Sequence, residues 1–326
     1  MSTRSICSIQ NRAKDLHSAE DTEVFCLGLA IQDTILSVAS IPREPVKIYA
    51  SARRDVGGGP AATASVAIAR LGGRASFAGR LGDDPTGAVL RRELDNEKVD
   101  VTWLRDFAGF QSPGSIILVD RQGERLIVAY ADPNLPRDPG WLKPQSLGNA
   151  VLCDLSWPEG AMKCLTAARD NGIPSVLDAD ISRHGRDEVA ALVATADHVV
   201  FSRPGLAQFT GTDGIEAGLR EAARPGHALI GVTDGADGLF WLDGGRVRNA
   251  RPPQVDVVDT VGAGDAFHGA LALALARRCP LDQAIAVANA VAALKCTRPG
   301  GRAGLPTWDA LRDFSPSLDV GWYKTS

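Results

Sequence analysis

The sequence lacks the features of a membrane protein, a nucleic-acid-binding protein and a secreted protein. It has 326 residues and a formal net charge of −4, so there is no basic excess to neutralise nucleic-acid or lipid phosphates. No apolar run approaches the roughly 20 residues that a membrane-spanning helix needs. Residues 1–21 are polar and have no apolar signal core, which predicts a flexible tail. We therefore expect a cytoplasmic protein with no membrane or nucleic-acid partner.

Paired cysteines and two common nucleotide-binding motifs are also missing. The six cysteines include no C-x-x-C pair, and several lie in apolar segments, which is typical of free thiols in a reducing compartment. No G-x-G-x-x-G follows an early strand, which argues against a dehydrogenase. No Walker loop of the form G-x-x-x-x-G-K-[ST] is present either.

The apolar pattern predicts an α/β fold with a buried parallel sheet. Residues 24–31 form a continuous apolar run, which is typical of a central strand covered on both faces. From residue 151 onward, strands and helices alternate at the spacing of a parallel sheet with helices on both faces. Residues 115–130 and 238–248 each hold two β-rich runs around a short turn, which predicts hairpins. The expected strands of the alternating part are 151–155, 175–178, 198–201 and 228–232, and the expected helices are 61–71, 86–97, 160–171, 187–196, 215–223 and 284–294.

Residues 259–267, DTVGAGDAF, are the most informative segment. They follow a strand-like run at 254–258 and precede an Ala/Leu-rich segment with high helix propensity. Gly262 and Gly264 let a ligand approach the backbone, and the first N–H groups of a helix suit a phosphate. Asp265 would repel that phosphate unless it serves as the base for an attacking hydroxyl, so the segment predicts phosphoryl transfer. The alternative interpretation is a Gly-rich turn whose Asp only caps the helix.

The longer pattern, D-T-x-G-A-G-D-x-F before a small-residue helix, resembles the C-terminal signature of the ribokinase-like (PfkB) carbohydrate kinases. Motifs along nearly the whole chain beyond the tail resemble this family. The resemblance implies a doubly wound, mainly parallel α/β sheet with a small β-sheet lid. It also implies ATP and Mg²⁺, with a loop for a monovalent cation near residues 294–301. The implied division is a flexible tail at 1–21, a kinase domain at 22–35, 57–104 and 132–326, and a lid at 36–56 and 105–131.

The resemblance implies roles for individual residues. Asp265 is the catalytic base, and Asp259 helps to place Mg²⁺ through water. Asp33 and Lys47 bind the sugar, Asp84 starts a helix, and His268 serves packing. The other implied residues are Val261, Gly262, Ala263 and Gly264 in the anion hole, Gly57, Gly58 and Gly59 at the sugar, and Thr233, Gly235, Gly238 and Asn289 at the nucleotide.

Several positions depart from the family pattern. Ala62 stands where the family usually has a sugar-binding Asn. Ser202 and Gly205 stand where many relatives have the Asn and Glu that help to hold Mg²⁺ and phosphate. The motifs are closest to the sulfofructose kinase branch, but Ala129 and Ser156 replace its sulfonate-binding Asn and Arg. Because a sulfonate would lose charge-assisted hydrogen bonds there, we expect a neutral ketose as the acceptor.

Three alternative functions stay open. The first is a sulfofructose kinase. The second is a nucleoside kinase of the same fold, which would need aromatic stacking in the lid, where only Tyr49, Phe107, Phe110 and Tyr130 are available. The third is a non-catalytic sugar sensor, which the lost Asn and Glu favour and the presence of Asp265 disfavours. We also expect a homodimer through the lid, because lid strands in this family often pair across a dimer and so cover their edges.

Overall fold

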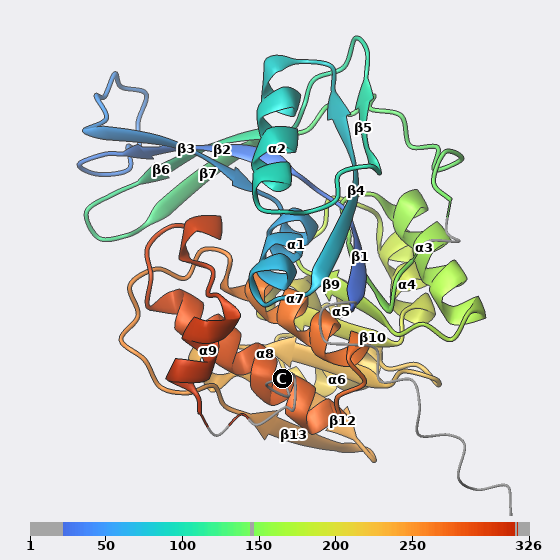
Figure 1. The fold of residues 1–326 in the computed structure, drawn as a ribbon. Coiled ribbons are helices and arrows are strands. Elements are labelled where there is room, and N and C mark those ends of the chain that lie inside the picture. Colours follow the sequence, from blue (N-terminus) through green and yellow to red (C-terminus); the bar gives the residue numbers. More distant parts are fainter. Residues whose placement is uncertain (1–21, 144–146, 317, 319–326) are drawn as a thin grey trace, which may run out of the picture.

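A nine-stranded sheet organises most of the chain (Figure 1). The computed structural model describes residues 22–143, 147–316 and 318. The sheet has the order β13-β12-β11-β10-β9-β8-β1-β4-β5 and is parallel except at β12 and β13. Its strands are β1 (Glu23–Leu27), β4 (Arg74–Gly82), β5 (Leu104–Phe107), β8 (Ala150–Asp154), β9 (Ser175–Ala179), β10 (His198–Ser202), β11 (Leu229–Thr233), β12 (Leu239–Asp243) and β13 (Arg246–Ala250).

Helices cover both faces of this sheet, and the strand residues alternate between two cores. In β1, Val24 and Cys26 pack into one core, while Phe25 and Leu27 pack into the other. Burial on both faces explains why the strand is apolar at successive positions. The first core contains α1 (Pro60–Arg70), α2 (Pro85–Asn96), α7 (Ala263–Ala276), α8 (Leu281–Cys296) and α9 (Trp308–Phe314), and the second contains α3 (Pro158–Asp170), α4 (Arg186–Thr195), α5 (Arg203–Thr210) and α6 (Ile215–Ala222).

A second, four-stranded sheet projects from the body of the molecule (Figure 1). Its order is β3-β2-β6-β7, and we call it the lid. The pairing of β2 with β6 is parallel, and the other two pairings are antiparallel. The strands are β2 (Ile31–Ser37), β3 (Ala52–Gly58), β6 (Gly114–Val119) and β7 (Arg125–Tyr130).

The predicted elements agree with the structure within a few residues, apart from two segments. Residues 24–31 are not one strand, because β1 ends at Leu27 and the chain enters the lid at Ile31. Gly28 makes this break possible, since a Cβ there would lie 2.1 Å from a carboxylate oxygen of Asp154. The strand expected at 254–258 does not form either. Prolines at 252 and 253 cannot donate to a sheet, and Val257 and Val258 are 62% and 61% exposed.

The lid boundaries also differ from the expectation. Because β2 begins at Ile31 and β3 continues to Gly58, the residues around Asp33 and the glycine loop belong to the lid sheet. Residues 104–107 form β5, which pairs with β4 in the large sheet instead of entering the lid. Helix α5 follows β10 and is absent from the sequence-based expectation.

Two expectations concerned membrane spans and cysteines. Among the described residues, no helix is both long and apolar enough to cross a membrane. Cys26, Cys153, Cys164 and Cys296 are free thiols, as expected, and Cys7 lies outside the described ranges.

Candidate active site

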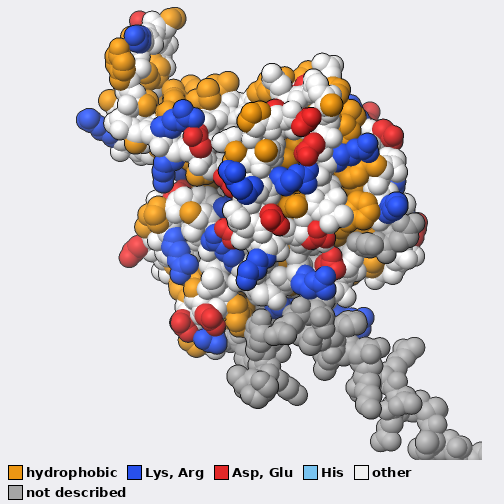
Figure 2. Space-filling view, turned by 45° about the horizontal axis from the view of Figure 1, so that its top comes forward, with side chains coloured by type: hydrophobic (Ala, Val, Ile, Leu, Met, Phe, Trp, Pro, Cys, Tyr) orange, Lys and Arg blue, Asp and Glu red, His pale blue; other side chains and the backbone are white. Residues whose placement is uncertain are grey.

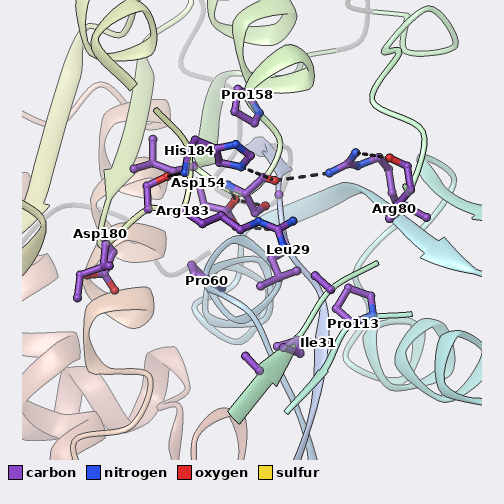
Figure 3. A pocket seen from close by; sticks show the side chains of 18 of the residues that line it. Leu29, Ile31, Pro60, Arg80, Pro113, Asp154, Pro158, Asp180, Arg183 and His184 are labelled. Carbon is purple, nitrogen blue, oxygen red and sulfur yellow. Dashed lines mark hydrogen bonds between the residues drawn. The ribbon is translucent and has the colours of Figure 1, made fainter. Parts of the chain in front are cut away.

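A cavity of about 690 Å³ opens at the carboxyl ends of β1, β8 and β9 (Figure 3). The strand order makes this a natural ligand site. From β1 the sheet continues to β4 and β5 on one side and to β8 through β13 on the other, and open α/β sheets bind ligands where the order reverses. The lid contributes Ala129 and Tyr130 to the lining, and the loop after β8 contributes Ser156. Two of the positions that distinguish this chain from the sulfofructose kinase branch, Ala129 and Ser156, therefore face the cavity.

Asp154 lines this cavity and connects three segments of the chain through its carboxylate. Its carboxylate accepts hydrogen bonds from the backbone N–H groups of Leu29 at 2.8 Å, Ala61 at 3.2 Å and Ser156 at 2.8 Å. One buried carboxylate thus joins the ends of β1 and β8 to the first turn of α1. Asp154 is not among the site residues expected from the sequence, although a lone Asp at the end of an apolar strand is the available signal.

The segment 261–264 forms an open cradle at the start of α7. Gly262 has φ of 77°, a left-handed conformation that favours glycine. No atom lies within 4 Å of a Cβ placed on Gly264, so the backbone there faces open space. The first N–H groups of α7, a 14-residue helix, have no partners within the helix and suit an anion. These features bring together the expected anion-hole residues Val261, Gly262, Ala263 and Gly264.

Asp259 fixes the shape of the cradle. One carboxylate oxygen accepts the N–H of Val261 at 2.9 Å, and the other accepts the N–H of Gly300 at 2.8 Å. Arg125, at the start of β7 in the lid, lies 3.3 Å from the first oxygen. These partners hold the pKa of Asp259 below its usual range despite partial burial. Asp259 therefore links the cradle, the loop after α8 and the lid.

Asp265 lies in the first turn of α7, directly after the cradle. Desolvation by the surrounding protein and the nearby carboxylate of Asp178 raise its pKa to about 7, although His268 and Arg302 oppose the shift. A carboxylate that titrates near neutral pH is suited to general-base chemistry.

His268 has electrostatic neighbours as well as the packing role expected from the sequence. Its Nδ1 lies 3.3 Å from a carboxylate oxygen of Asp178 and 2.8 Å from the carbonyl oxygen of Gly264. Its Nε2 lies 3.3 Å from the carbonyl oxygen of Val200. Both His268 and Asp178 are buried, and desolvation lowers the pKa of the imidazole and raises that of the carboxyl. Both shifts favour the uncharged forms of the two groups.

Asp33 is the third residue of β2 and therefore belongs to the lid sheet. Its carboxylate accepts a hydrogen bond from the hydroxyl of Ser115 on β6. Desolvation raises its pKa, and the Ser115 hydrogen bond and the charge of Arg302 lower it in part. Asp33 is not among the residues that line the cavity, but Ile31, two residues before it on the same strand, is.

Gly57, Gly58 and Gly59, directly before α1, each lie so close to another group that a Cβ would clash with it. A Cβ on Gly58 would lie 2.3 Å from a carboxylate oxygen of Asp33, and one on Gly57 would lie 2.2 Å from a guanidinium nitrogen of Arg302. Gly59 has φ of 96°, and its Cβ would lie 2.2 Å from the carbonyl oxygen of Leu29. Gly58 is thus the member of the loop that lies against the expected sugar-binding carboxylate.

Arg302 is a site residue that our sequence analysis missed. It is 8% exposed, and its guanidinium donates to the carbonyl oxygen of Gly58 at 2.6 Å. The charges of Asp33 and Asp265 both act on it, and burial lowers its pKa to about 10. Its Nη1 has no hydrogen-bond partner and lies 3.8 Å from a carboxylate oxygen of Glu93. Arg302 is therefore a buried cation on which the charges of Glu93, Asp265 and Asp33 all act.

The expected nucleotide-binding residues lie near β11 and the β12–β13 hairpin. Thr233 ends β11, and Gly235 has φ of 51° with open space around its Cβ position. Gly238 and Asn289 both contact Ala250: a Cβ on Gly238 would lie 2.2 Å from the carbonyl oxygen of Ala250, and the amide of Asn289 donates to it at 2.9 Å. These contacts give both residues a structural task in the turn, and their role towards adenine stays a prediction.

Lys47 lies in an exposed part of the lid, with its ammonium 5.2 Å from the ring centroid of Tyr49, and it is not among the residues that line the cavity. Its role in sugar binding stays a prediction.

Three other positions have structural roles. Asp84 caps α2 and accepts the N–H of Gly87 at 2.7 Å, as expected. Ser202 caps α5 and donates to Asp180. A Cβ on Gly205 would lie 2.4 Å from the carbonyl oxygen of Ala179.

Arginines also line the cavity, which the sequence analysis did not predict. Arg80 stacks 4.6 Å from the ring centroid of Trp157 and donates to the carbonyl oxygen of Pro136 at 3.1 Å. Arg137 forms ion pairs with Glu159 and Glu188, and Arg183 is exposed at the rim. Figure 3 shows Arg183 close to Asp154 and Arg80 to the right of both.

Comparison with known proteins gives consistent matches. The pfkB family of carbohydrate kinases matches residues 21–308. A fructokinase of Klebsiella pneumoniae is 32% identical over 278 residues, which cover 78% of this chain and 90% of that protein. An aminoimidazole riboside kinase of Salmonella typhimurium is 31% identical over 291 residues, which cover 82% and 90%. A solved structure from Agrobacterium tumefaciens, described as a ribokinase candidate, is 35% identical, with a TM-score of 0.84 and coverage of 94% of this chain and 99% of that chain. The chain therefore belongs to the pfkB family of carbohydrate kinases and is a sugar or nucleoside kinase.

Proposed function

We propose that this kinase transfers the γ-phosphoryl group of ATP to a primary hydroxyl of a neutral ketose. The observation that carries the proposal is Asp265, whose pKa of about 7 makes it a base, directly after the open backbone cradle at Gly264. An anion hole next to a base supports phosphoryl transfer to a hydroxyl.

Each site residue has a separate role in the proposed phosphoryl transfer. Asp265 accepts the proton of the acceptor hydroxyl as that oxygen attacks phosphorus. The N–H groups of 261–264 hold the transferring phosphoryl group, and Arg302 offsets negative charge between Asp33 and Asp265. Asp33, oriented by Ser115, accepts hydrogen bonds from sugar hydroxyls. Thr233, Gly235, Gly238 and Asn289 lie on the nucleotide side, and closure of the lid excludes water from the reaction.

Mg²⁺ fits Asp259 only through water. Both carboxylate oxygens of Asp259 already accept backbone N–H groups, so the remaining lone pairs suit a metal-bound water better than direct coordination. Mg²⁺ is commonly held by few protein groups and by the phosphates of the nucleotide, whose charge it neutralises.

The cavity residues support the neutral acceptor. Ala129 and Ser156 line it where the sulfofructose kinase branch has an Asn and an Arg. Arg137 is neutralised by two glutamates, and Arg80 is occupied by backbone carbonyl oxygens and the Trp157 ring. The fructokinases among the relatives add support for a ketose.

The second candidate is a kinase of an anionic sugar, and Arg183 favours it. This arginine lies at the rim of the same cavity and is exposed. It could pair with a carboxylate, sulfonate or phosphate at the end of the sugar far from the reacting hydroxyl.

A substrate panel separates these candidates. ADP release is measured with ATP and Mg²⁺ for fructose-like ketoses, aldoses, nucleosides, sulfofructose and sugar phosphates. We expect the highest kcat/KM for a neutral ketose, and Asp33→Ala should raise KM for it more than it lowers kcat. A preference for an anionic sugar that Arg183→Ala abolishes would instead establish the second candidate. If no acceptor in the panel gives rise to ADP release, the protein is instead a non-catalytic sensor.

A further inference from the structure

Lys295, in the last turn of α8, is a buried lysine, and packing alone does not explain why a charged side chain occupies this position. Its side chain is 0% exposed, and it is the one lysine among the buried residues of the described chain. Burial of an ammonium is costly unless it is compensated, and an apolar side chain would fill the same space without that cost. The position of its ammonium group therefore needs a reason.

The ammonium lies against the base of the phosphate cradle. Lys295 Nζ donates to the carbonyl oxygen of Asp259 at 2.8 Å. The carboxylate of that same residue holds the N–H groups of Val261 and Gly300. The backbone N–H groups of residues 258 and 259 donate to the carbonyl oxygen of Cys296 at 2.8 and 3.1 Å. Residues 258 and 259, which lead into the cradle, are thus attached to the end of α8 by two backbone hydrogen bonds and by the ammonium of Lys295.

The loop after α8 encloses the same lysine. A Cβ on Gly304 would lie 3.2 Å from Cε of Lys295, and it would lie 3.0 and 3.3 Å from the carbonyl oxygens of Arg298 and Pro299. The lysine stem therefore runs between the cradle segment and the loop 298–304. The carbonyl oxygen of Asp259 is the hydrogen-bond partner of the ammonium, and the loop after α8 packs against the methylene next to it.

A free monovalent cation does not fit beside this group. The sequence resemblance implies such a cation in the loop near residues 294–301, but the carbonyl oxygen of Asp259 is already bound by an ammonium. A second positive charge next to Lys295 and close to Arg125 would be repelled, since both cations already act on Asp259. The charges of Asp259 and Asp265 act on Lys295 and oppose the loss of its proton on burial.

We propose that the ammonium of Lys295 is the built-in monovalent cation of the phosphate cradle, so that nucleotide binding and phosphoryl transfer do not require a free one. The inference rests on the proposed kinase function. The ammonium of Lys295 would act as a fixed positive charge that orders residues 259–264 and stabilises the negative charge of the phosphates.

The experiment compares cations at constant ionic strength. The wild-type protein is assayed in K⁺, Na⁺, NH₄⁺ and tetramethylammonium chloride, for sugar phosphorylation and, by calorimetry, for affinity for ADP with Mg²⁺. We expect wild-type values in the four salts to agree within about twofold. Lys295→Ala should lose at least about tenfold in kcat and in ADP affinity in tetramethylammonium, and K⁺ or NH₄⁺ should restore part of both, because the small side chain leaves space for a cation.

Two matched variants serve as controls. Lys295→Met fills the space without a charge and should be as impaired as the alanine variant but not restored by any cation. Lys295→Gln keeps a hydrogen-bond donor for the carbonyl oxygen of Asp259 without the charge, and it should also be impaired. If Lys295→Ala does not fold, as judged by its melting temperature, the methionine and glutamine variants decide the question.

Three results would overturn the proposal. They are activation of the wild-type protein several-fold by K⁺, full activity of Lys295→Gln, and a folded Lys295→Ala that no small cation improves. ADP affinity is measured without sugar, so these outcomes are distinguishable from a failure of the proposed function, in which no acceptor is phosphorylated.

Discussion

At the scale of single residues, the pH dependence of catalysis should be set by Asp265. Its pKa is raised to about 7, and only its ionised form can accept a proton. We therefore expect kcat/KM to fall about tenfold for each pH unit below about 7, and to level off above it. Asp265→Asn should lower kcat by about 10²–10⁴ and abolish this acidic limb, while ADP affinity stays within a few-fold. An Asn variant that keeps near-normal turnover would show that another group is the base.

The same residue should destabilise the folded protein at neutral pH. Below pH about 4, Asp265 is protonated in both the folded and the unfolded state and contributes nothing. Between about 4 and 7 the unfolded state loses its proton first, so the free energy of unfolding falls as the pH rises. Asp265→Asn should therefore be more stable than wild type at pH 8, on the order of 2–4 kcal/mol, and equal to it near pH 4. Thermal or urea unfolding at the two pH values tests this, and an equal difference at both would contradict it.

At the scale of elements, two glycines at the N-terminus of α7 are needed for different reasons, one for space and one for backbone conformation. A Cβ on Gly264 meets no atom within 4 Å, whereas Gly262 has φ of 77°. Gly264→Ala should therefore keep the wild-type melting temperature but lose at least about tenfold in kcat, because its methyl group enters the cradle. Gly262→Ala should destabilise the protein by about 1–2 kcal/mol, since an L-residue is strained there. Calorimetry with steady-state kinetics separates the two, and a full-speed Gly264→Ala would place the phosphate elsewhere.

At the scale of the whole molecule, the lid leaves a hydrophobic surface uncovered. Strand β7 is exposed along its length, with Ile127 59% and Val128 61% exposed, and Figure 2 shows hydrophobic side chains on this projection. Such a surface at a sheet edge is a liability unless another chain covers it. We propose that two lids pair in a homodimer. Light scattering should give the mass of a dimer, and Ile127→Glu should give a monomer that remains folded. A wild-type monomer at micromolar concentration would rule out this dimer.

Some of the site could be predicted from the sequence because it is local. The cradle, Asp265 and the helix α7 lie within 18 residues of chain, and their glycine spacing and helix propensity determine the local conformation. The apolar run of β1 and the strand–helix alternation likewise predicted the two-core sheet, because burial on both faces demands apolar residues at successive positions. These features depend on neighbours in the sequence.

Other parts depend on contacts between distant segments, and only the tertiary structure determined them. Arg302 reaches Gly58 across 244 residues, and Asp154 holds Ala61 across 93. The ammonium of Lys295 meets Asp259 only because α8 returns beside the cradle. The same reason explains the wrong strand at 254–258, whose alternating pattern has no neighbouring strand to pair with. The sequence by itself determined the chemistry of the phosphate loop, whereas the packing of distant loops determined the charges that surround it.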